Sequence, residues 1–112
     1  MYMYNYNAIV ASIYDGDTIR VNIDLGFDSW LFNVPIRFYG IDTPEIRGEF
    51  KEAGLVSKNF VSSRIPVGSK IIINTIRDSK EKYGRYLGII FYNGINLNEE
   101  LISYGNAIRY LE

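Results

Sequence analysis

The stretch IVASIYDGDTIRVNIDL, residues 9–25, decides the fold. Apolar and polar residues alternate on both sides of Asp15 and Gly16, and a period of two residues is typical of half-buried strands. An Asp-Gly pair supplies the positive φ that a tight hairpin turn requires, so the pattern predicts two antiparallel strands joined at this point. Asp17 is not needed for such a turn.

A third strand is expected over residues 32–41. Alternation places Ile36 and Phe38 on one face of this strand and Arg37 on the other. Pro35 cannot donate a hydrogen bond to a neighbouring strand, which indicates that the strand begins at the edge of a sheet.

The period changes to that of a helix over residues 49–65, and Pro66 marks the end of this helix. A shorter helix is predicted over residues 97–104, where Asn96 is placed to cap the first turn. The apolar residues of the first helix that are expected to face the core are Ala53, Val56 and Phe60, flanked by Val61 and Ile65.

Two more strands are predicted over residues 70–77 and 85–92, with a polar loop over residues 78–82 and a tight turn at residues 93–94. The order of three strands, a helix, two strands and a helix suggests a mainly β protein with helices, a five-stranded Greek-key barrel of the OB type. No linker or repeat interrupts the chain, so we predict a single domain over residues 1–112.

Composition and charge narrow the possible functions. A formal net charge of −1 provides no overall basic field for binding nucleic acid, so any phosphate chemistry has to be local. The absence of histidine and cysteine excludes zinc sites built on those residues and histidine-based catalysis. No apolar run approaches the roughly 20 residues of a membrane span, and no signal peptide is visible. We therefore expect a cytoplasmic protein without membrane association, with a secreted and processed chain as the alternative.

Carboxylates at two strand ends form a candidate metal site. Asp17 follows the predicted hairpin turn, and the segment DTPE, residues 42–45, follows the third strand. Calcium takes roughly six to eight oxygen ligands from carboxylates, carbonyls and water, and these segments offer such oxygens. Each segment also has a purely structural interpretation, residues 15–18 as a turn and residues 42–45 as a helix cap or loop start.

Arginines and tyrosines near these segments are candidates for binding phosphate and bases. The guanidinium forks of Arg37 and Arg85 match phosphate oxygens, although Arg37 could equally form a structural ion pair with Glu45 or Asp42. Tyrosine rings either stack on bases or pack on sheet faces. The tyrosines considered for stacking are Tyr83, Tyr104 and Tyr110.

Three segments resemble the thermonuclease, or staphylococcal nuclease, family: residues 14–21 (YDGDTIRV), 36–45 (IRFYGIDTPE) and 82–88 (KYGRYLG). The resemblance extends through residues 96–101 (NLNEEL) and covers nearly the whole chain. It implies an OB-type barrel and a calcium-dependent endo- or exonuclease, a phosphoric diester hydrolase. The implied substrate is DNA and/or RNA, single-stranded or frayed, which is cleaved to leave 3′-phosphate ends.

The resemblance also implies roles for individual residues. The implied catalytic residues are Arg37, Glu45 and Arg85. The implied calcium ligands are Asp17, Asp42 and the carbonyl of Thr43. The implied substrate-binding residues are Lys82, Tyr83 and Tyr110. In this scheme Glu45 activates or positions the attacking water, and Asp15 supports the calcium ligands without touching the ion.

The chain departs from the family pattern in its short loop over residues 46–51 and in ending at Glu112, before the C-terminal helix of longer relatives. The alternative function is a catalytically weak or inactive OB-type module that binds nucleic acid or protein. A structural calcium-binding domain would leave Arg37 and Arg85 without a role. Because the charged positions of the family are all present, we expect a catalyst.

Overall fold

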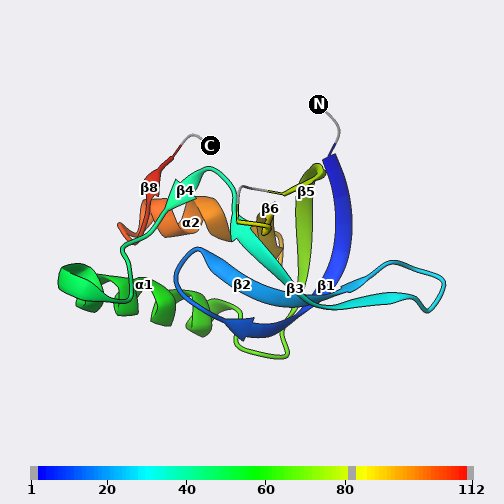
Figure 1. Cartoon of the computed structure of the whole chain (residues 1–112), viewed down its shortest axis with the longest axis horizontal. Helices are drawn as coiled ribbons and strands as arrows, with labels where there is room; N and C mark the ends of the chain where they lie inside the picture. Colours follow the sequence, from blue (N-terminus) through cyan, green and yellow to red (C-terminus); the bar gives the residue numbers. More distant parts are fainter. Residues whose placement is uncertain (1–2, 81–82, 111–112) are drawn as a thin grey trace.

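The computed structural model describes residues 3–80 and 83–110, in which strands close into a ring with two α-helices on one side (Figure 1). The strands are β1 (Met3–Ile13), β2 (Thr18–Asp24), β3 (Trp30–Phe38), β4 (Ile41–Asp42), β5 (Lys70–Lys80), β6 (Tyr86–Tyr92), β7 (Ile95–Asn96) and β8 (Ile108–Arg109). The helices are the 3-10 helix η1 (Gly48–Phe50), α1 (Lys51–Arg64) and α2 (Leu97–Ser103). No helix among the described residues is long and apolar enough to cross a membrane.

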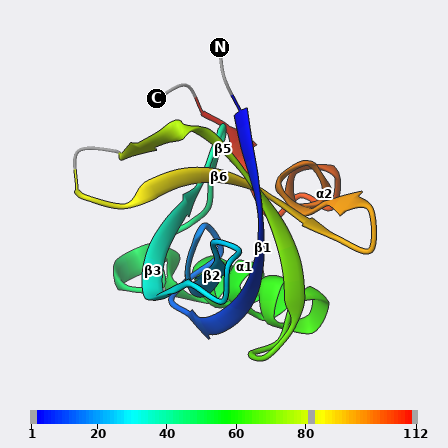
Figure 2. The same cartoon turned by 90° about the vertical axis from the view of Figure 1, so that its right-hand side faces the viewer.

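Five strands make the ring, in the order β1, β2, β3, β6, β5 (Figure 2). Neighbouring strands are antiparallel except β3 and β6, which pair in parallel and close the ring. This pairing begins at Ile36, directly after Pro35, so the first part of β3 pairs only with β2, as Pro35 predicts. The ring confirms the mainly β fold and resembles an OB-type barrel.

The connection between β1 and β2 differs from the predicted tight turn. The two strands pair as expected, with Ile13 opposite Ile19, but residues 14–17 form a loop between them. Gly16 does not have a positive φ. A Cβ atom at this position would lie 2.7 Å from Cβ of Ser57 and 3.0 Å from Oγ1 of Thr43, so glycine is needed here for close packing.

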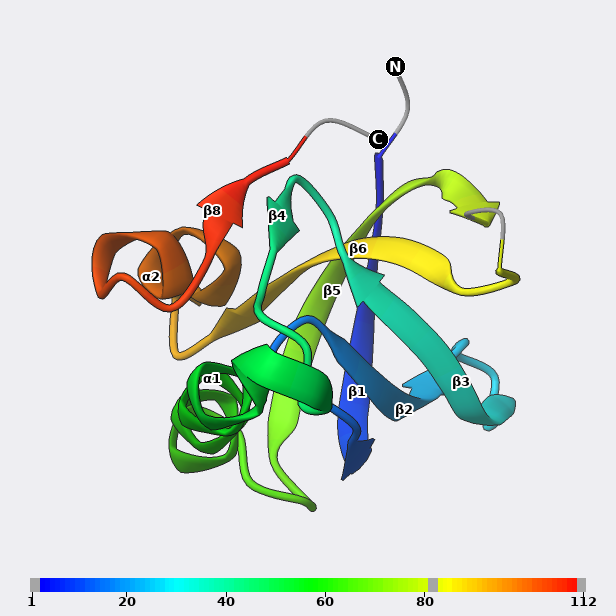
Figure 3. The ribbon, with the colours of Figure 1, turned by 60° about the vertical axis from the view of Figure 1, so that its left-hand side comes forward.

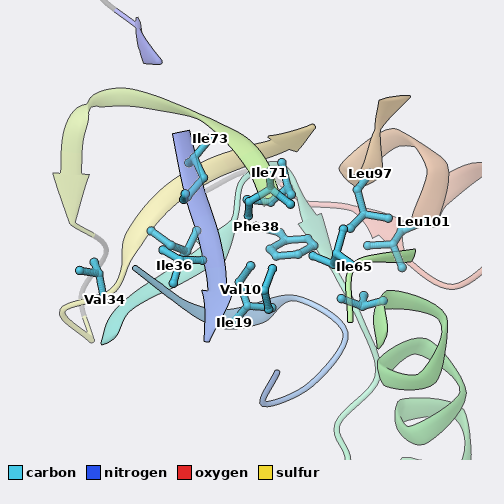
Figure 4. Close-up of a cluster of buried hydrophobic side chains, with 14 of the residues drawn as sticks. Val10, Ile19, Val34, Ile36, Phe38, Ile65, Ile71, Ile73, Leu97 and Leu101 are labelled. Carbon is cyan, nitrogen blue, oxygen red and sulfur yellow. The ribbon is translucent and has the colours of Figure 1, made fainter. Parts of the chain in front are cut away.

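The core fills the ring and continues to the helices. Figure 4 shows Phe38 in the centre, with Ile36 and Ile73 on one side and Leu97 and Leu101 of α2 on the other. All five side chains are completely or almost completely buried. Burial of this many large side chains stabilises a barrel of this size and fixes the ends of β2 and β3.

The prediction for the buried face of α1 was right only in part, since Val61 and Ile65 are completely buried and Phe60 packs against the core. The buried residues are Gly54, Ser57 and Val61, whereas Ala53 and Val56 are exposed. Small residues face inward because the helix packs closely against the loops beside it, and such residues contribute little to an apolar pattern.

The other predicted elements are present with shifted bounds. β3 covers Trp30–Phe38 instead of residues 32–41, and the first helix begins as η1 at Gly48. β5 continues to Lys80, into the segment that was predicted to be a loop. At the β6–β7 turn, Asn93 and Gly94 both have positive φ, as a tight hairpin requires. Asn96 caps α2 by accepting a hydrogen bond from the backbone N of Glu99 at 3.0 Å.

Candidate active site

The β1–β2 loop and the β4–α1 loop meet where β2 begins and β3 ends. Thr18 and Arg37 are paired across these strands, and the backbone N of Phe38 donates to the carbonyl of Asp17 at 2.8 Å. β4 follows immediately and is held by β8, since the register pairs Asp42 with Ile108 (Figure 3). The β1–β2 loop and the start of the β4–α1 loop are thereby brought to one place.

Asp17 is the centre of the hydrogen-bond network. Its side chain is buried, and its Oδ1 accepts from the hydroxyl of Thr18 at 3.2 Å. Its Oδ2 accepts from the backbone N of Thr43 at 3.1 Å and lies 3.3 Å from Nη1 of Arg37. One carboxylate therefore connects the start of β2, the end of β3 and the start of the β4–α1 loop.

Arg37 is buried between two acidic residues. Its Nη1 contacts Asp17, its Nη2 donates to Oδ1 of Asp42 at 3.3 Å, and Nη1 also donates to the carbonyl of Phe38 at 3.0 Å. The structural ion pair considered from the sequence is therefore present with Asp42 and extended to Asp17. A buried guanidinium with two carboxylates holds their charges in place.

Asp15 supports this arrangement from the β1–β2 loop. Its Oδ1 accepts from the backbone N of Asp17 at 3.1 Å. Burial, followed by the charge of the Asp17 carboxylate, raises the pKa of Asp15 from 3.8 to about 7. Burial and the neighbouring carboxylate thus favour the neutral form of Asp15.

Asp42 lies at the solvent edge of the same cluster, with about half of its side chain exposed. Its pKa is raised by burial and next by the charge of Asp17, against the opposing effect of Arg37, and Glu45 raises it further. A cation would be attracted here, because it would relieve the repulsion that disfavours the ionised carboxylates.

The donor set fits a calcium ion. Asp17, Asp42 and the backbone of Thr43 provide oxygens on adjoining segments, and Oγ1 of Thr43 is buried without a hydrogen-bond partner among the described residues. No group of three acidic side chains in residues 3–80 and 83–110 is arranged to hold a metal unaided. A bound ion would therefore need carbonyl and water ligands in addition to carboxylates, which is usual for calcium.

Glu45 follows Pro44 on the loop that leads to α1. Its carboxylate is exposed and has no hydrogen bond or ion pair with any other described residue. α1 supports the backbone of this loop, because Gly54 lies so close to the carbonyl of Glu45 that any Cβ atom would overlap with it. The carboxylate is thus free while its main chain is held.

Arg85 approaches the cluster from the start of β6. Its Nη1 donates to Oγ1 of Thr18 at 3.1 Å, and its Cζ lies 5.5 Å from the ring centre of Tyr83, whose side chain is largely exposed. Arg37 and Arg85 therefore both reach the Asp17 network, one directly and one through Thr18. Lys82, a predicted substrate-binding residue, lies outside the described residues.

Tyr110 is attached to the other side of the site. Its backbone N donates to the carbonyl of Gly40 at 2.9 Å, beside the turn that leads into β4, and its ring is about half exposed. Tyr104 instead packs against Phe60, with ring centres 5.3 Å apart. Tyr110 therefore stays near the site, whereas Tyr104 belongs to the contact between α1 and α2.

The sequence interpretation missed residues that position the charged groups. Thr18 connects Asp17 to Arg85, and Ser57 on α1 packs on Gly16 while its hydroxyl donates to the carbonyl of Asn106 at 2.7 Å. Thr18 lies within the YDGDTIRV segment and could have been found there. Ser57 could not, since a serine in a helix carries no local signal of such a contact.

A family model matches most of the chain. The model of the family described as staphylococcal nuclease homologue matches residues 35–112, which include Arg37, the DTPE segment and Arg85. The β1–β2 loop with Asp17 lies before the matched segment.

Curated relatives match over nearly the whole chain. Uncharacterized protein MJ1439 of Methanocaldococcus jannaschii is 33% identical over 131 residues, covering 96% of this chain and 60% of that protein. Endonuclease YhcR of Bacillus subtilis is 31% identical over 114 residues, covering 94% of this chain and 9% of that protein. Uncharacterized protein pXO1-141/BXA0211/GBAA_pXO1_0211 of Bacillus anthracis is 29% identical over 102 residues, covering 88% of this chain and 45% of that protein.

The chain therefore spans less than two thirds of the length of each of these relatives. The match to the family model, in contrast, covers more than half of this chain and contains two of the three segments that meet at the site. The chain belongs to the family of staphylococcal nuclease homologues.

Proposed function

We propose that this domain is a calcium-dependent nuclease that hydrolyses phosphodiester bonds of DNA and/or RNA and leaves 3′-phosphate ends. The observation that carries the proposal is the convergence of distant charged residues on the buried carboxylate of Asp17. Arg37 contacts this carboxylate directly, Arg85 reaches it through Thr18, and Asp42 reaches it through Arg37. Membership in a nuclease family and similarity to a protein named as an endonuclease support it.

The two arginines would bind the phosphate under attack. Arg37 now balances the charges of Asp17 and Asp42, and once a cation balances them its guanidinium becomes available to a phosphate oxygen. Arg85 is held nearby through Thr18. In-line attack on a phosphodiester builds negative charge on the phosphoryl oxygens, which two guanidinium groups stabilise more strongly in the transition state than in the substrate.

Asp17, Asp42 and the carbonyl of Thr43 would hold calcium. When bound, the ion supplies positive charge beside the phosphate and orients it. Asp15 would serve the site by fixing the backbone of Asp17, and the buried hydroxyl of Thr43 remains available to a water ligand.

Glu45 would position the attacking water. Its carboxylate has no hydrogen-bond partner within the described residues, so it can accept a hydrogen bond from a water molecule without breaking another contact. Carboxylates are in general weak bases near neutral pH, and holding the water in line is therefore the larger part of its task.

The substrate is expected to be a single strand or a frayed duplex end. The exposed rings of Tyr83 and Tyr110 lie beside two of the segments that meet at the site, and either ring could stack on a base next to the cleaved phosphate. Lys82, which precedes Tyr83 in the sequence and lies outside the described residues, would add positive charge for the substrate. Stacking requires unpaired bases, which favours single strands over intact duplex.

Cleavage of a labelled single-stranded oligonucleotide tests the proposal. With calcium at alkaline pH we expect cleavage to products that end in 3′-phosphate, and with a chelator we expect the oligonucleotide to stay intact. Glu45→Ala should bind the same oligonucleotide and cleave it at least about 100-fold more slowly. An oligonucleotide that stays intact with calcium at high protein concentration would contradict the proposal, and binding without cleavage would favour the alternative of an inactive binding module.

A further inference from the structure

The β2–β3 hairpin extends well beyond the barrel, away from the helices (Figure 1). Its far end is apolar and exposed: Phe27 is 103% exposed relative to a free residue, Phe32 71% and Trp30 37%. A run of exposed apolar side chains on a narrow projection is unusual for a soluble domain and marks a surface that contacts another molecule.

The aromatic residues share one face of the hairpin. Trp30 and Phe32 are two residues apart on β3 and stack with ring centres 6.4 Å apart and planes at 20°. Trp30 lies directly opposite Asp24 of β2. Alternation along β2 puts Arg20 and Asn22 on this same outward face, which we call the hairpin face: Arg20, Asn22, Asp24, Trp30 and Phe32.

The free edge of β3 does not favour the addition of another strand. Asn33 has a positive φ of 59°, and its backbone N is already bound by Oδ1 of Asn22 at 2.9 Å, which makes a bulge in the strand. Pro35 follows and has no N–H to donate. Bulges and prolines protect sheet edges from pairing, so the hairpin offers its side chains to a partner and not its backbone.

The charges of the hairpin face exclude nucleic acid as the partner. Asp24 and Asp28 lie toward the far end, and residues 21–36 contain no lysine or arginine. The one basic residue on the face is Arg20, toward the barrel, where its Nη1 donates to the carbonyl of Asn33 at 2.8 Å. It precedes Asp24 by four residues and is therefore about 13 Å away along an extended strand. A polyanion would be repelled by most of this surface.

We propose that the hairpin face binds the same face of a second copy of this chain, with the two hairpins antiparallel across a twofold axis near Asn22. This arrangement places Arg20 of each copy opposite Asp24 of the other, so the dimer contains two equivalent ion pairs. Phe32 of one copy then covers Phe32 of the other near the axis, and each Trp30 lies beside an ion pair because it is paired with Asp24.

The apolar area available agrees with a weak dimer. Aromatic side chains bury about 150–250 Å² each, so the exposed parts of Trp30 and Phe32 provide on the order of 200 Å² of apolar area per copy, to which the polar side chains of the hairpin face add. A standard interface buries about 800 Å² per partner, and smaller ones form transient complexes. We expect a dissociation constant on the order of 10–100 µM.

Sedimentation of two charge variants, alone and mixed, tests this dimer. Arg20→Glu places two acidic side chains opposite each other in its own homodimer, and Asp24→Lys places two basic ones, so each variant alone should dimerise at least about 10-fold more weakly than the unmodified protein. When the variants are mixed in equal amounts, the introduced glutamate of one faces the introduced lysine of the other. The remaining Arg20 then faces the remaining Asp24, and dimerisation should return.

A second pair of variants makes the test independent of those charges. Phe32→Ser should weaken dimerisation at least about 10-fold, whereas Phe50→Ser, which removes a similarly exposed ring on η1, should leave it unchanged. The fluorescence of Trp30, the single tryptophan of the chain, should shift to shorter wavelength as the dimer forms. Circular dichroism confirms that each variant is folded.

Several outcomes would overturn the proposal. The unmodified protein could remain monomeric up to about 1 mM. The two charge variants could fail to dimerise when mixed, or Phe50→Ser could weaken the dimer as much as Phe32→Ser does. A monomeric protein whose Trp30 fluorescence shifts only with phosphatidylcholine vesicles would show that the hairpin binds lipid instead.

Discussion

The two ends of the β2–β3 hairpin have opposite character. At the barrel end charged groups are buried, since Asp17 and Arg37 are both almost inaccessible to water. At the far end apolar groups are exposed, with Phe27 and Phe32 largely in solvent. Both ends thereby reverse the usual distribution of residues, in which charges face water and large apolar side chains face the core.

Different contacts hold the two ends of this pair of strands. Buried charges at the barrel end have been brought together at a cost in desolvation, which is offset by their mutual pairing and by close packing against α1. The far end is held by the pairing of β2 with β3, by the pairing of Asp24 with Asn7 of β1, and by turn contacts such as that between Asp24 and the backbone N of Gly26. Substitutions at the barrel end should therefore affect catalysis and stability strongly, and those at the far end should affect mainly association.

The largest expected effect is on catalysis at the barrel end. Glu45→Ala and Arg85→Ala should each lower the cleavage rate at saturating calcium by about 100-fold or more, which corresponds to about 2.7 kcal/mol of lost transition-state stabilisation. The melting temperature should change little, because both side chains act mainly on the substrate. Glu49→Ala and Arg109→Ala, which remove exposed charges of the same kind, are the controls, and an equal loss of rate in the controls would contradict the assignment.

Glycine substitutions compare the packing of the two ends. Gly16→Ala forces a Cβ atom against Ser57 and Thr43 and should cost about 3 kcal/mol of unfolding free energy, or roughly 10 °C in melting temperature. The Cβ atom added by Gly26→Ala would have no other atom within 4 Å, and only the positive φ of 78° disfavours alanine there. We expect this variant to lose about 1 kcal/mol of unfolding free energy. Thermal unfolding measures both values. If Gly26→Ala were the more damaging variant, close packing at the barrel end would not be the reason for Gly16.

The pH dependence of stability should come from the barrel end as well. The pKa of Asp15 is about 7 in the folded protein and 3.8 without the fold, so between these values the folded chain holds a proton that the unfolded chain releases. The part of the unfolding free energy that neutral Asp15 contributes is therefore lost as the pH rises from about 4 to about 7. The raised pKa of Asp42 acts in the same direction.

Asp15→Asn removes this dependence because asparagine does not ionise. With a chelator present, urea unfolding should show that the free energy of unfolding of the unmodified protein falls by about 2–3 kcal/mol more than that of Asp15→Asn between pH ~5 and pH ~8. Asp28→Asn at the exposed end of the hairpin is the matched control. A difference between Asp15→Asn and the unmodified protein that stays constant with pH would contradict the account.

The smallest effect is expected at the far end. Phe27→Ser removes the most exposed aromatic side chain and should change the unfolding free energy by no more than about 0.5 kcal/mol. Its cleavage rate, measured below about 1 µM where the chain is monomeric, should equal that of the unmodified protein. A large loss of stability in urea unfolding would mean that this ring has a structural role within one copy.

Local patterns predicted much of the fold. The alternation around residues 9–25 predicts β1 and β2, Pro35 marks where β3 becomes paired on both sides, and Asn96 caps α2. These features depend on neighbours in the sequence and are visible there. The core face of α1 was predicted only in part. Gly54 and Ser57 are buried by contact with distant loops, and such small residues do not contribute to an apolar pattern.

The candidate site was predicted in its charged residues but not in their connections. The resemblance of the DTPE segment and Arg85 to a known family indicated which residues belong together. The connection from Arg85 through Thr18 to Asp17 depends on three-dimensional packing, as does the placement of Arg37 between Asp17 and Asp42. The exposure of Trp30 and Phe32 is likewise invisible in the sequence, where they look like residues of a core strand.

A crystal structure with calcium and a nucleoside bisphosphate would show directly whether the ion and a phosphate bind at the Asp17 cluster. We predict that calcium is bound by Asp17, Asp42 and the carbonyl of Thr43, and that Arg37 and Arg85 both donate hydrogen bonds to one phosphate beside the ion. A phosphate bound elsewhere, or an Arg37 that still contacts both carboxylates while calcium lies outside this cluster, would contradict the account.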